Sequence, residues 1–185
     1  MRTLADTIEM ARKGDSPAQE ALVNALSYKM YILCMRYVRN REDAEERMQD
    51  GFCKALRSLS SFSYVSDAGF HAWIKTIMIR ECIEQIRNEN AFNKASESEA
   101  YNIGFEADVF SKMAKNEFQV YIARLPVGCR TIFNLRVDGH PHQEIARLLG
   151  IKLGTVWSQL SKAKSLLQKM LTSKQSDHVR NTSDE

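Results

Sequence analysis

The apolar residues of positions 1–90 recur every three or four residues, which is the spacing of amphipathic helices. Breaks in this pattern separate four predicted helices. Pro17 at a first helical position, with Ser16 as the cap, marks the start of the second. The predicted helices are Leu4–Lys13, Pro17–Tyr37, Glu42–Ser58 and Gly69–Asn88, and the polar segment Ser60–Asp67 is predicted to be a loop.

The third predicted helix has an apolar side and an acidic side. Its apolar side carries Ala44, Met48, Phe52, Ala55 and Leu59. The opposite side carries Asp43, Glu46, Asp50 and Arg57, with Gln49 at its margin. By itself, this acidic face is either an ordinary solvated surface or a docking face for a basic protein partner.

The fourth predicted helix is apolar on two nearly opposite sides. Phe70, Trp73, Ile74 and Ile77 share one side, and Ile79, Cys82, Ile83 and Ile86 share the other. A helix of this kind is usually central in its domain, with other helices packed around it. Residues 1–90 are therefore predicted to form one compact helical domain.

The second half of the chain predicts another small helical domain. Residues 91–108 lack a sustained helical stripe and are predicted to be a flexible linker. Further helices are predicted from Val109 to Leu125 and over Val127–Asp138, His142–Leu149 and Thr155–Leu171. These helices predict a second domain over residues 109–174. The polar residues 175–185 are predicted to be a frayed tail. The predicted fold class is all-α, with two small domains joined by the linker.

Composition agrees with helices and gives no sign of a membrane segment. The 185 residues include only 8 Gly and 3 Pro, and 44% are hydrophobic. No apolar run has the length that a bilayer requires, and the N-terminus lacks a signal-peptide core, so a cytoplasmic protein without direct membrane insertion is expected. The four cysteines (Cys34, Cys53, Cys82 and Cys129) form no CxxC motif and are expected to be buried thiols without a metal.

Positive charge is concentrated near the C-terminal end. Residues 124–174 contain nine basic side chains but only Asp138 and Glu144 as acids, a net charge of +7. Residues 1–90, in contrast, contain 13 basic and 13 acidic side chains. A local excess of this size predicts a phosphate-binding surface, although a solvated lysine face would have the same charge.

Residues 143–156 have the pattern of a helix-turn-helix. Ala146 is small where the two helices would cross, and Gly150 suits the left-handed residue that ends the first helix. In the second helix, Val156 and Leu160 would point inward. The outward-facing residues are Ser158, Ser161, Lys162 and Ser165, flanked by Thr155, Gln159, Trp157 and Lys164. Combined with the charge, this pattern favours binding in the DNA major groove over a helical hairpin that only packs.

Other classes of function are less well supported. The four histidines accompany no nucleophile motif, phosphate-binding loop or metal set, so no catalytic residue, cofactor or metal is predicted and an enzyme is not expected. A stand-alone two-domain helix-turn-helix regulator remains the alternative. An adaptor that uses its helices only for protein contacts is a third possibility.

Two blocks together resemble the extracytoplasmic-function (ECF, group 4) sigma factors of bacterial RNA polymerase. NREDAEERMQDGFCKALRSLSSF followed by FHAWIKTIMIRECIEQIR resembles conserved region 2. LPVGCRTIFNLRVDGHPHQEIARLLGIKLGTVWSQLSKAKSLLQKML resembles region 4. The segments GHPHQEIA and SQLSKAK are more similar to sigma factors of the Bacteroidetes than to those of enterobacteria. The resemblance covers roughly residues 5–172.

The resemblance implies partners and roles. Core RNA polymerase would be contacted through the clamp helices of its largest subunit and through its flap, and region 2 would dock with Asp43, Glu46, Gln49 and Asp50. The promoter −10 element would be read and opened by Ser60, Phe62, Ser63, Tyr64, Lys75, Arg80 and Arg87. The −35 element would be read by Thr155, Trp157, Ser158, Gln159, Ser161 and Lys162. An anti-sigma factor is a further expected partner.

Within these sets, some assignments stay open. Phe62 would either stack on an unpaired base or anchor its loop in the core. Trp157 and Gln159 stand where many family members have Arg or Lys, which implies weaker phosphate contacts or a different −35 sequence. Arg47 replaces a usual aliphatic residue at the edge of the docking face.

Overall fold

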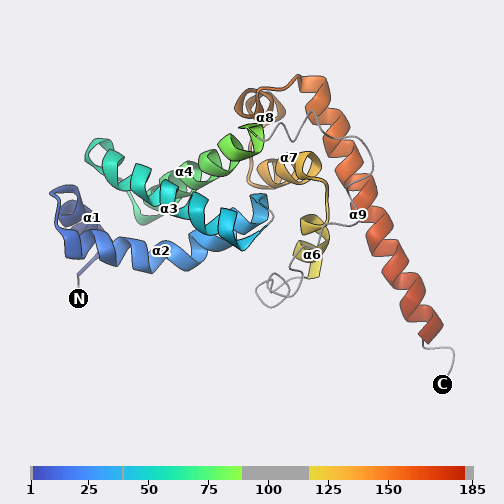
Figure 1. Cartoon of the computed structure of the whole chain (residues 1–185), viewed down its shortest axis with the longest axis horizontal. Coiled ribbons are helices and arrows are strands. Elements are labelled where there is room, and N and C mark those ends of the chain that lie inside the picture. Colours follow the sequence, from blue (N-terminus) through green and yellow to red (C-terminus); the bar gives the residue numbers. More distant parts are fainter. Residues whose placement is uncertain (1, 39, 89–116, 182–185) are drawn as a thin grey trace. The chain divides into compact units, whose positions relative to one another are not determined.

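The computed structural model describes residues 2–38, 40–88 and 117–181, and every regular element in these ranges is a helix (Figure 1). The chain divides into two compact units, residues 1–86 and 87–185. The all-α prediction is confirmed for the described residues. The predicted linker at 91–108 and the start of the helix predicted from Val109 lie outside them. None of the helices in the described ranges combines the length and apolarity needed to cross a membrane.

The first unit consists of four α-helices and one short 3-10 turn. All four α-helices of this unit begin with a side-chain cap, and the second is capped by Asp15, which accepts a hydrogen bond from Ala18 N at 2.8 Å. The prediction that Ser16 is the N-cap is therefore wrong by one residue: the carboxylate of Asp15 caps the first turn, and Ser16 is the first residue of the helix. The elements are α1 (Leu4–Arg12), α2 (Ser16–Tyr37), α3 (Arg41–Ser58), η1 (Leu59–Ser61) and α4 (Asp67–Asn88).

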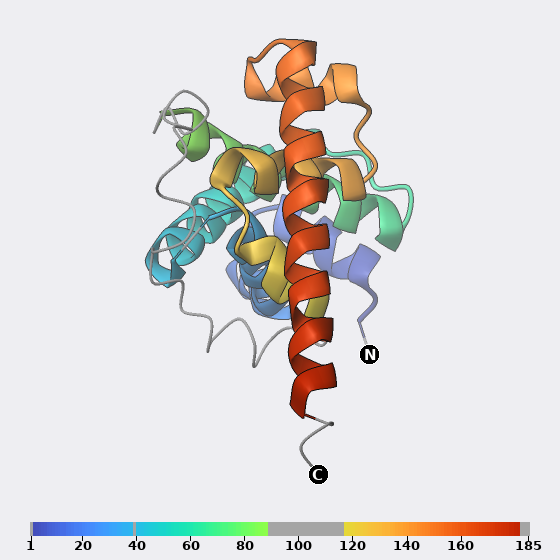
Figure 2. The same cartoon turned by 90° about the vertical axis from the view of Figure 1, so that its right-hand side faces the viewer.

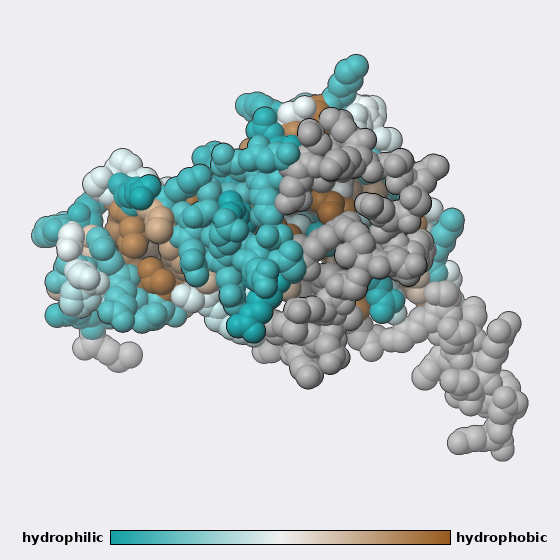
Figure 3. Space-filling view, in the orientation of Figure 1, coloured by the Kyte–Doolittle hydropathy of each residue, from teal (hydrophilic) through white to brown (hydrophobic). Residues whose placement is uncertain are grey.

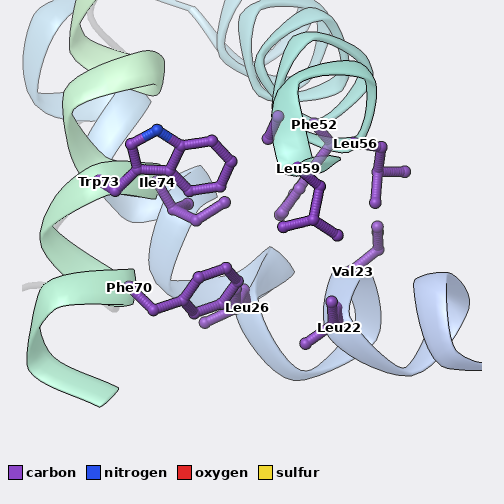
Figure 4. Close-up of a pocket in the computed structure, with 10 residues that line it drawn as sticks. Leu22, Val23, Leu26, Phe52, Leu56, Leu59, Phe70, Trp73 and Ile74 are labelled. Atoms are coloured by element: carbon purple, nitrogen blue, oxygen red, sulfur yellow. The ribbon is translucent and has the colours of Figure 1, made fainter. Parts of the chain in front are cut away.

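The core of the first unit lies where α2, α3 and α4 meet. Figure 4 shows one small apolar pocket, lined by Leu22 and Leu26 of α2, Phe52 of α3, Leu59 of η1 and Phe70 of α4. As predicted, α4 is buried on two sides, since the buried set includes Phe70, Ile74, Met78, Ile79, Cys82, Ile83 and Ile86. Hydrophilic residues cover most of the visible surface of this unit (Figure 3).

Close packing of α3 on α4 depends on Gly51. A Cβ atom at this position would collide with the Sδ atom of Met78, whose side chain is fully buried. Three residues along α3, the Lys54 ammonium pairs with the carboxylate of Glu81 at 2.7 Å and with that of Glu84 at 3.4 Å. Glu81 is buried, so Lys54 compensates a carboxylate that has little access to water.

Replacing Lys54 by Met is therefore expected to destabilise the first unit. It leaves the Glu81 carboxylate without its cation, at a cost of about 1–2 kcal/mol once the solvent access of Lys54 is considered. The pKa of Lys54 is raised, chiefly by its hydrogen bond to Glu81. Because the pKa of Lys54 is higher in the folded than in the unfolded protein, the pair contributes its full stabilisation below the unfolded pKa of about 10.5. This stabilisation is lost as the pH rises through the pKa of folded Lys54. Urea unfolding measures the loss of stability, and the double variant Lys54→Met/Glu81→Gln should recover part of it, because Glu81→Gln removes the unpaired charge. Equal unfolding midpoints for Lys54→Met and wild type would contradict the prediction.

In its described residues, the second unit contains α6 (Glu117–Ala123), α7 (Val127–Val137), α8 (His142–Leu149) and α9 (Leu153–Asn181). Its main core joins α6, α7 and α9 and contains Ile122, Leu125, Cys129, Ala163 and Leu167. Figure 2 shows α9 as one continuous helix. The predicted Thr155–Leu171 helix is thus too short, and the expected frayed tail is helical up to Asn181. The segment contains neither Gly nor Pro after Gly154, and polar residues alone do not end a helix.

Candidate functional site

The acidic side of α3 presents carboxylates that are arranged around one arginine. Glu46 and Asp50 have side chains 63% and 47% exposed, and Gln49 beside them is exposed. Arg47, whose side chain is only 18% exposed, contacts Glu46 and reaches Asp50 at 3.2 Å. The pairs hold both carboxylates at the surface, where they remain accessible to a basic partner.

Asp43, the fourth residue of the predicted docking set, has a structural task as well. Its backbone N–H donates to Asn40 Oδ1 at 2.7 Å, and its carboxylate accepts from Asn40 Nδ2 at 2.8 Å. These bonds cap the start of α3. Substitution of Asp43 would therefore change helix stability as well as surface charge. Substitution of Glu46 or Asp50 would change the surface charge without removing a helix cap.

The loop before α4 is anchored by Phe62. Its ring stacks on Trp73 with centroids 4.5 Å apart and contacts Phe70 edge-on at 5.7 Å. Phe62 is half-buried, so the structure supports the loop-anchoring reading for this residue. The first residues of the predicted loop, Ser60 and Ser61, belong to the 3-10 turn η1.

The rest of the loop presents small polar groups to solvent. Ser60 and Ser63 are exposed, as is Ser66, whose hydroxyl accepts a hydrogen bond from Gly69 N at 3.1 Å. Tyr64 is half-buried and its hydroxyl donates to Asp67, which raises the pKa of Tyr64. Val65 is 86% exposed. Sequence reasoning missed Val65, although an apolar residue among serines outside any helical stripe is a usable signal.

The three basic residues predicted on α4 do not share one face. Arg80 and Arg87 are exposed and lie on one strip of the helix. Lys75 is half-buried and lies about 120–140° away from them around the axis, by the period of the helix. Each of the three was predicted as a candidate for contacting a backbone phosphate, and this stays a prediction. The helical period places Lys75 toward the packed side of α4, so it would not act on the same surface as Arg80 and Arg87.

The second unit contains the predicted helix-turn-helix. Gly150 ends α8 with a left-handed backbone, at φ 66°, and Ile151 N donates to Ala146 O at 3.0 Å across the turn. Ile145, Leu149, Val156 and Leu160 are buried and lock α8 against α9. The orientation predicted for α9 is confirmed, since Ser158, Ser161 and Lys162 are exposed.

Three further residues of the predicted −35 set lie around this exposed face. Trp157 is 59% exposed, and its ring meets His142 of α8 edge-on with centroids 6.5 Å apart. Thr155 is half-buried, and its carbonyl accepts from the Ser158 hydroxyl at 3.0 Å. Gln159 is half-buried and accepts a bond from the Cys129 thiol at 2.9 Å, so it packs toward α7. The contact between His142 and Trp157 was not predicted, because it joins two helices.

Not all of the local positive charge is on the surface. Arg130 is only 2% exposed, and its Nη1 donates to Ala123 O at 3.1 Å, which caps the C-terminal end of α6.

The prediction of buried cysteines is confirmed for Cys34, Cys82 and Cys129 and is wrong for Cys53, which is exposed. Within the described ranges, no group of three or more His, Cys, Asp or Glu side chains is suited to hold a metal ion.

Comparison with known proteins agrees with this arrangement. Residues 22–92 match Sigma-70 region 2, and residues 115–167 match Sigma-70 region 4. The chain is 28% identical to the ECF RNA polymerase sigma factor SigM of Mycobacterium tuberculosis, over 92% of this chain and 85% of the relative. It is 28% identical to SigW of Bacillus subtilis, over 89% and 94%. The chain therefore belongs to the ECF family of RNA polymerase sigma factors, which are transcription initiation factors.

Proposed function

We propose that this chain docks on core RNA polymerase through α3 and contacts promoter DNA with both of its units. The observation that carries the proposal is the pairing, in one chain, of an exposed acidic face on α3 with an exposed hydroxyl-and-lysine face on the second helix of a helix-turn-helix. The functional modules would be residues 1–90 and 109–174. The site of action would be the cytoplasm, where core polymerase and promoter DNA are found.

The polymerase-docking part of the proposal concerns Glu46, Gln49 and Asp50, with Asp43 at the edge of the face. Their partner would be the clamp helices of the largest subunit, while the second unit would contact the flap. Charge complementarity across such an interface favours fast and oriented association. An anti-sigma factor would compete for these surfaces, and this partner is proposed from the family resemblance alone.

The −10 element would be bound by the loop of the first unit and by the exposed strip of α4. An unpaired base of the non-template strand would lie against the exposed part of the loop, where Ser63, Val65 and Ser66 are accessible. Arg80 and Arg87 would neutralise backbone phosphates. Phe62 and Tyr64 would act mainly by shaping the loop, given their contacts with Trp73 and Asp67.

The −35 element would be bound by α9. Ser158, Ser161 and Lys162 would face the major groove, and Thr155 and Gln159 would help to set their positions. The indole of Trp157 has no positive charge, so it would contact apolar base edges such as the thymine methyl group where many family members have a cation.

The test of the proposed function is run-off transcription with bacterial core polymerase and genomic promoter fragments, with and without the full chain. Specific transcripts that require the chain support it. A footprint produced by the chain alone, without transcripts, would favour the stand-alone regulator instead. No footprint and no transcript would contradict both.

Lys162 and Trp157 are expected to contribute to −35 binding in different ways. Lys162→Ala should weaken binding to all promoters and reduce the slope of log affinity against log salt by about 1, because one phosphate contact is lost. Trp157→Ala should keep that slope and relax the preference at one base pair. Holoenzyme titrations at several salt concentrations measure both. Lys164→Ala is the comparison variant: Lys164 is also exposed but lies on the opposite flank of the face, beside Trp157 and about 160° around the helix axis from Lys162. Identical behaviour of Lys162→Ala and Lys164→Ala would contradict the assignment.

A further inference from the structure

Arg12, at the end of α1, reaches across the first unit to the loop before α4. Its Nε donates to Leu59 O at 3.4 Å, and its Nη2 donates to Phe62 O. These carbonyls lie 47 and 50 residues further along the chain, at the first residue of η1 and at the residue that follows its end. Arg12 itself lies outside residues 22–92, which match Sigma-70 region 2.

The guanidinium is well suited to these contacts. Its third branch, Nη1, pairs with Glu9 Oε2 at 3.3 Å, so three acceptors in different directions bind one planar group. A lysine ammonium at the same place would offer a point charge without the fixed fork. The two carbonyl acceptors, of Leu59 and Phe62, also lie at the C-terminal ends of α3 and η1, where a positive charge is favoured by the helix dipole.

Together with the Phe62 ring, Arg12 fixes the start of the loop. The backbone is held at Leu59 and Phe62 by Arg12, and the Phe62 side chain is held by Trp73 and Phe70. The exposed residues Ser63 and Val65 follow directly after this double anchor. A loop that is fixed at its start loses less conformational freedom when it binds a ligand, which favours binding.

We propose that Arg12 is a positioning residue for promoter opening: it preorganises the loop that captures an unpaired base. This inference rests on the proposed function, in which the loop binds the non-template strand. Because Arg12 contacts Glu9, Leu59 and Phe62 and none of the proposed docking residues of α3, its effect is confined to the opening step. Core binding and −35 binding do not depend on it.

The variant Arg12→Gln tests this role in the holoenzyme, and Lys13→Gln is its matched control. Lys13 pairs with the same Glu9 at 3.4 Å and its side chain is 72% exposed. Both changes remove one positive charge next to Glu9, but only the first removes the loop contacts. Arg12→Lys keeps the charge without the fork and is expected to lie between them. Glu9→Gln keeps the loop contacts and is expected to resemble wild type.

The expected result concerns promoter opening, measured by permanganate reactivity of unpaired thymines. On a duplex promoter, Arg12→Gln should form about tenfold fewer open complexes, the size expected when hydrogen bonds from a charged donor are lost. Lys13→Gln should stay within about twofold of wild type, as exposed ion pairs contribute little. On a promoter with a mismatched −10 region, the deficit of Arg12→Gln should disappear, since unpairing no longer limits the reaction. Affinity for core polymerase should be unchanged.

A second measurement follows the loop directly in the free chain. The sequence has 2 tryptophans, so Trp157→Phe leaves Trp73 as the only indole. Acrylamide quenching of Trp73 should increase in Arg12→Gln and not in Lys13→Gln, because Phe62 no longer covers the ring.

Several results would overturn the inference. One is equal opening by Arg12→Gln and Lys13→Gln, and another is an equal loss of core affinity and opening in Arg12→Gln. A deficit that persists on the mismatched promoter would also contradict it. Each of these leaves the proposed function intact, whereas a wild-type holoenzyme that opens no promoter would overturn the proposed function together with the inference.

Discussion

Simultaneous replacement of Glu46 by Gln and Asp50 by Asn is expected to lower affinity for core polymerase between about tenfold and a hundredfold. The double change removes both carboxylates of the α3 face while keeping side-chain size. It also leaves Arg47, which now pairs with both, without an anionic partner on this face. A positive charge then faces a partner that is proposed to be basic, so repulsion adds to the lost attraction.

This variant separates docking from folding better than one that includes Asp43. Asp43 participates in the cap of α3 with Asn40, so its substitution would also destabilise the helix. Glu45→Gln is the control. Glu45 is on the same helix and pairs with Arg41 at 2.7 Å, but its position in the helical period turns it away from Glu46 and Asp50.

The measurement is competition between labelled wild type and each variant for a limiting amount of core polymerase, at two salt concentrations. The double variant should compete poorly, and the difference from wild type should shrink at high salt, because screening weakens the attraction. Full competition by the double variant would exclude this face as the docking surface. A loss as large for Glu45→Gln would point to a general charge effect.

Phe70→Ala is expected to have the largest effect on stability, about 3–5 kcal/mol. Phe70 is 1% exposed and lines the junction of α2, α3 and α4 (Figure 4). Its removal leaves a cavity in a place where helices from three parts of the chain meet. It also removes one of the two rings that hold Phe62. We therefore expect both a lower unfolding midpoint and a looser loop.

Urea unfolding followed by Trp73 fluorescence in a Trp157→Phe background reports on the first unit alone. Phe70→Leu, which keeps an apolar side chain, should lose clearly less stability than Phe70→Ala. Val65→Ala should lose almost none, since Val65 is exposed. A Phe70→Ala variant that unfolds at the wild-type midpoint would show that this junction is not the core of the unit.

Local patterns in the sequence were sufficient for most of the helices and for the helix-turn-helix. The His142–Leu149 helix was predicted at its observed bounds, and Gly150 was predicted in the left-handed conformation that it adopts. The exposed set Ser158, Ser161 and Lys162 was predicted from the helical period alone. These successes share a cause: helical period and helix-ending glycines act over a few residues and need no knowledge of distant partners.

The errors are of another kind. Gln159 packs toward Cys129, and Arg130 is buried under the end of α6, although both were predicted among exposed or phosphate-binding residues. Lys75 was predicted to contact phosphate, and the helical period already separates it from Arg80 and Arg87. The surroundings of Gln159 and Arg130 could not be obtained from local pattern, because each depends on which helix covers the residue.

The sequence by itself determined that this protein is built from helices, where the helix-turn-helix lies, and which residues α9 presents. Tertiary structure alone decided that Arg12 holds the loop at Leu59 and Phe62, that Phe62 faces Trp73, and that Gly51 lets α3 approach Met78. The physical reason is range. A helix is specified by hydrogen bonds and side chains within one or two turns, whereas these contacts join residues that are distant in sequence and meet only after the helices have packed.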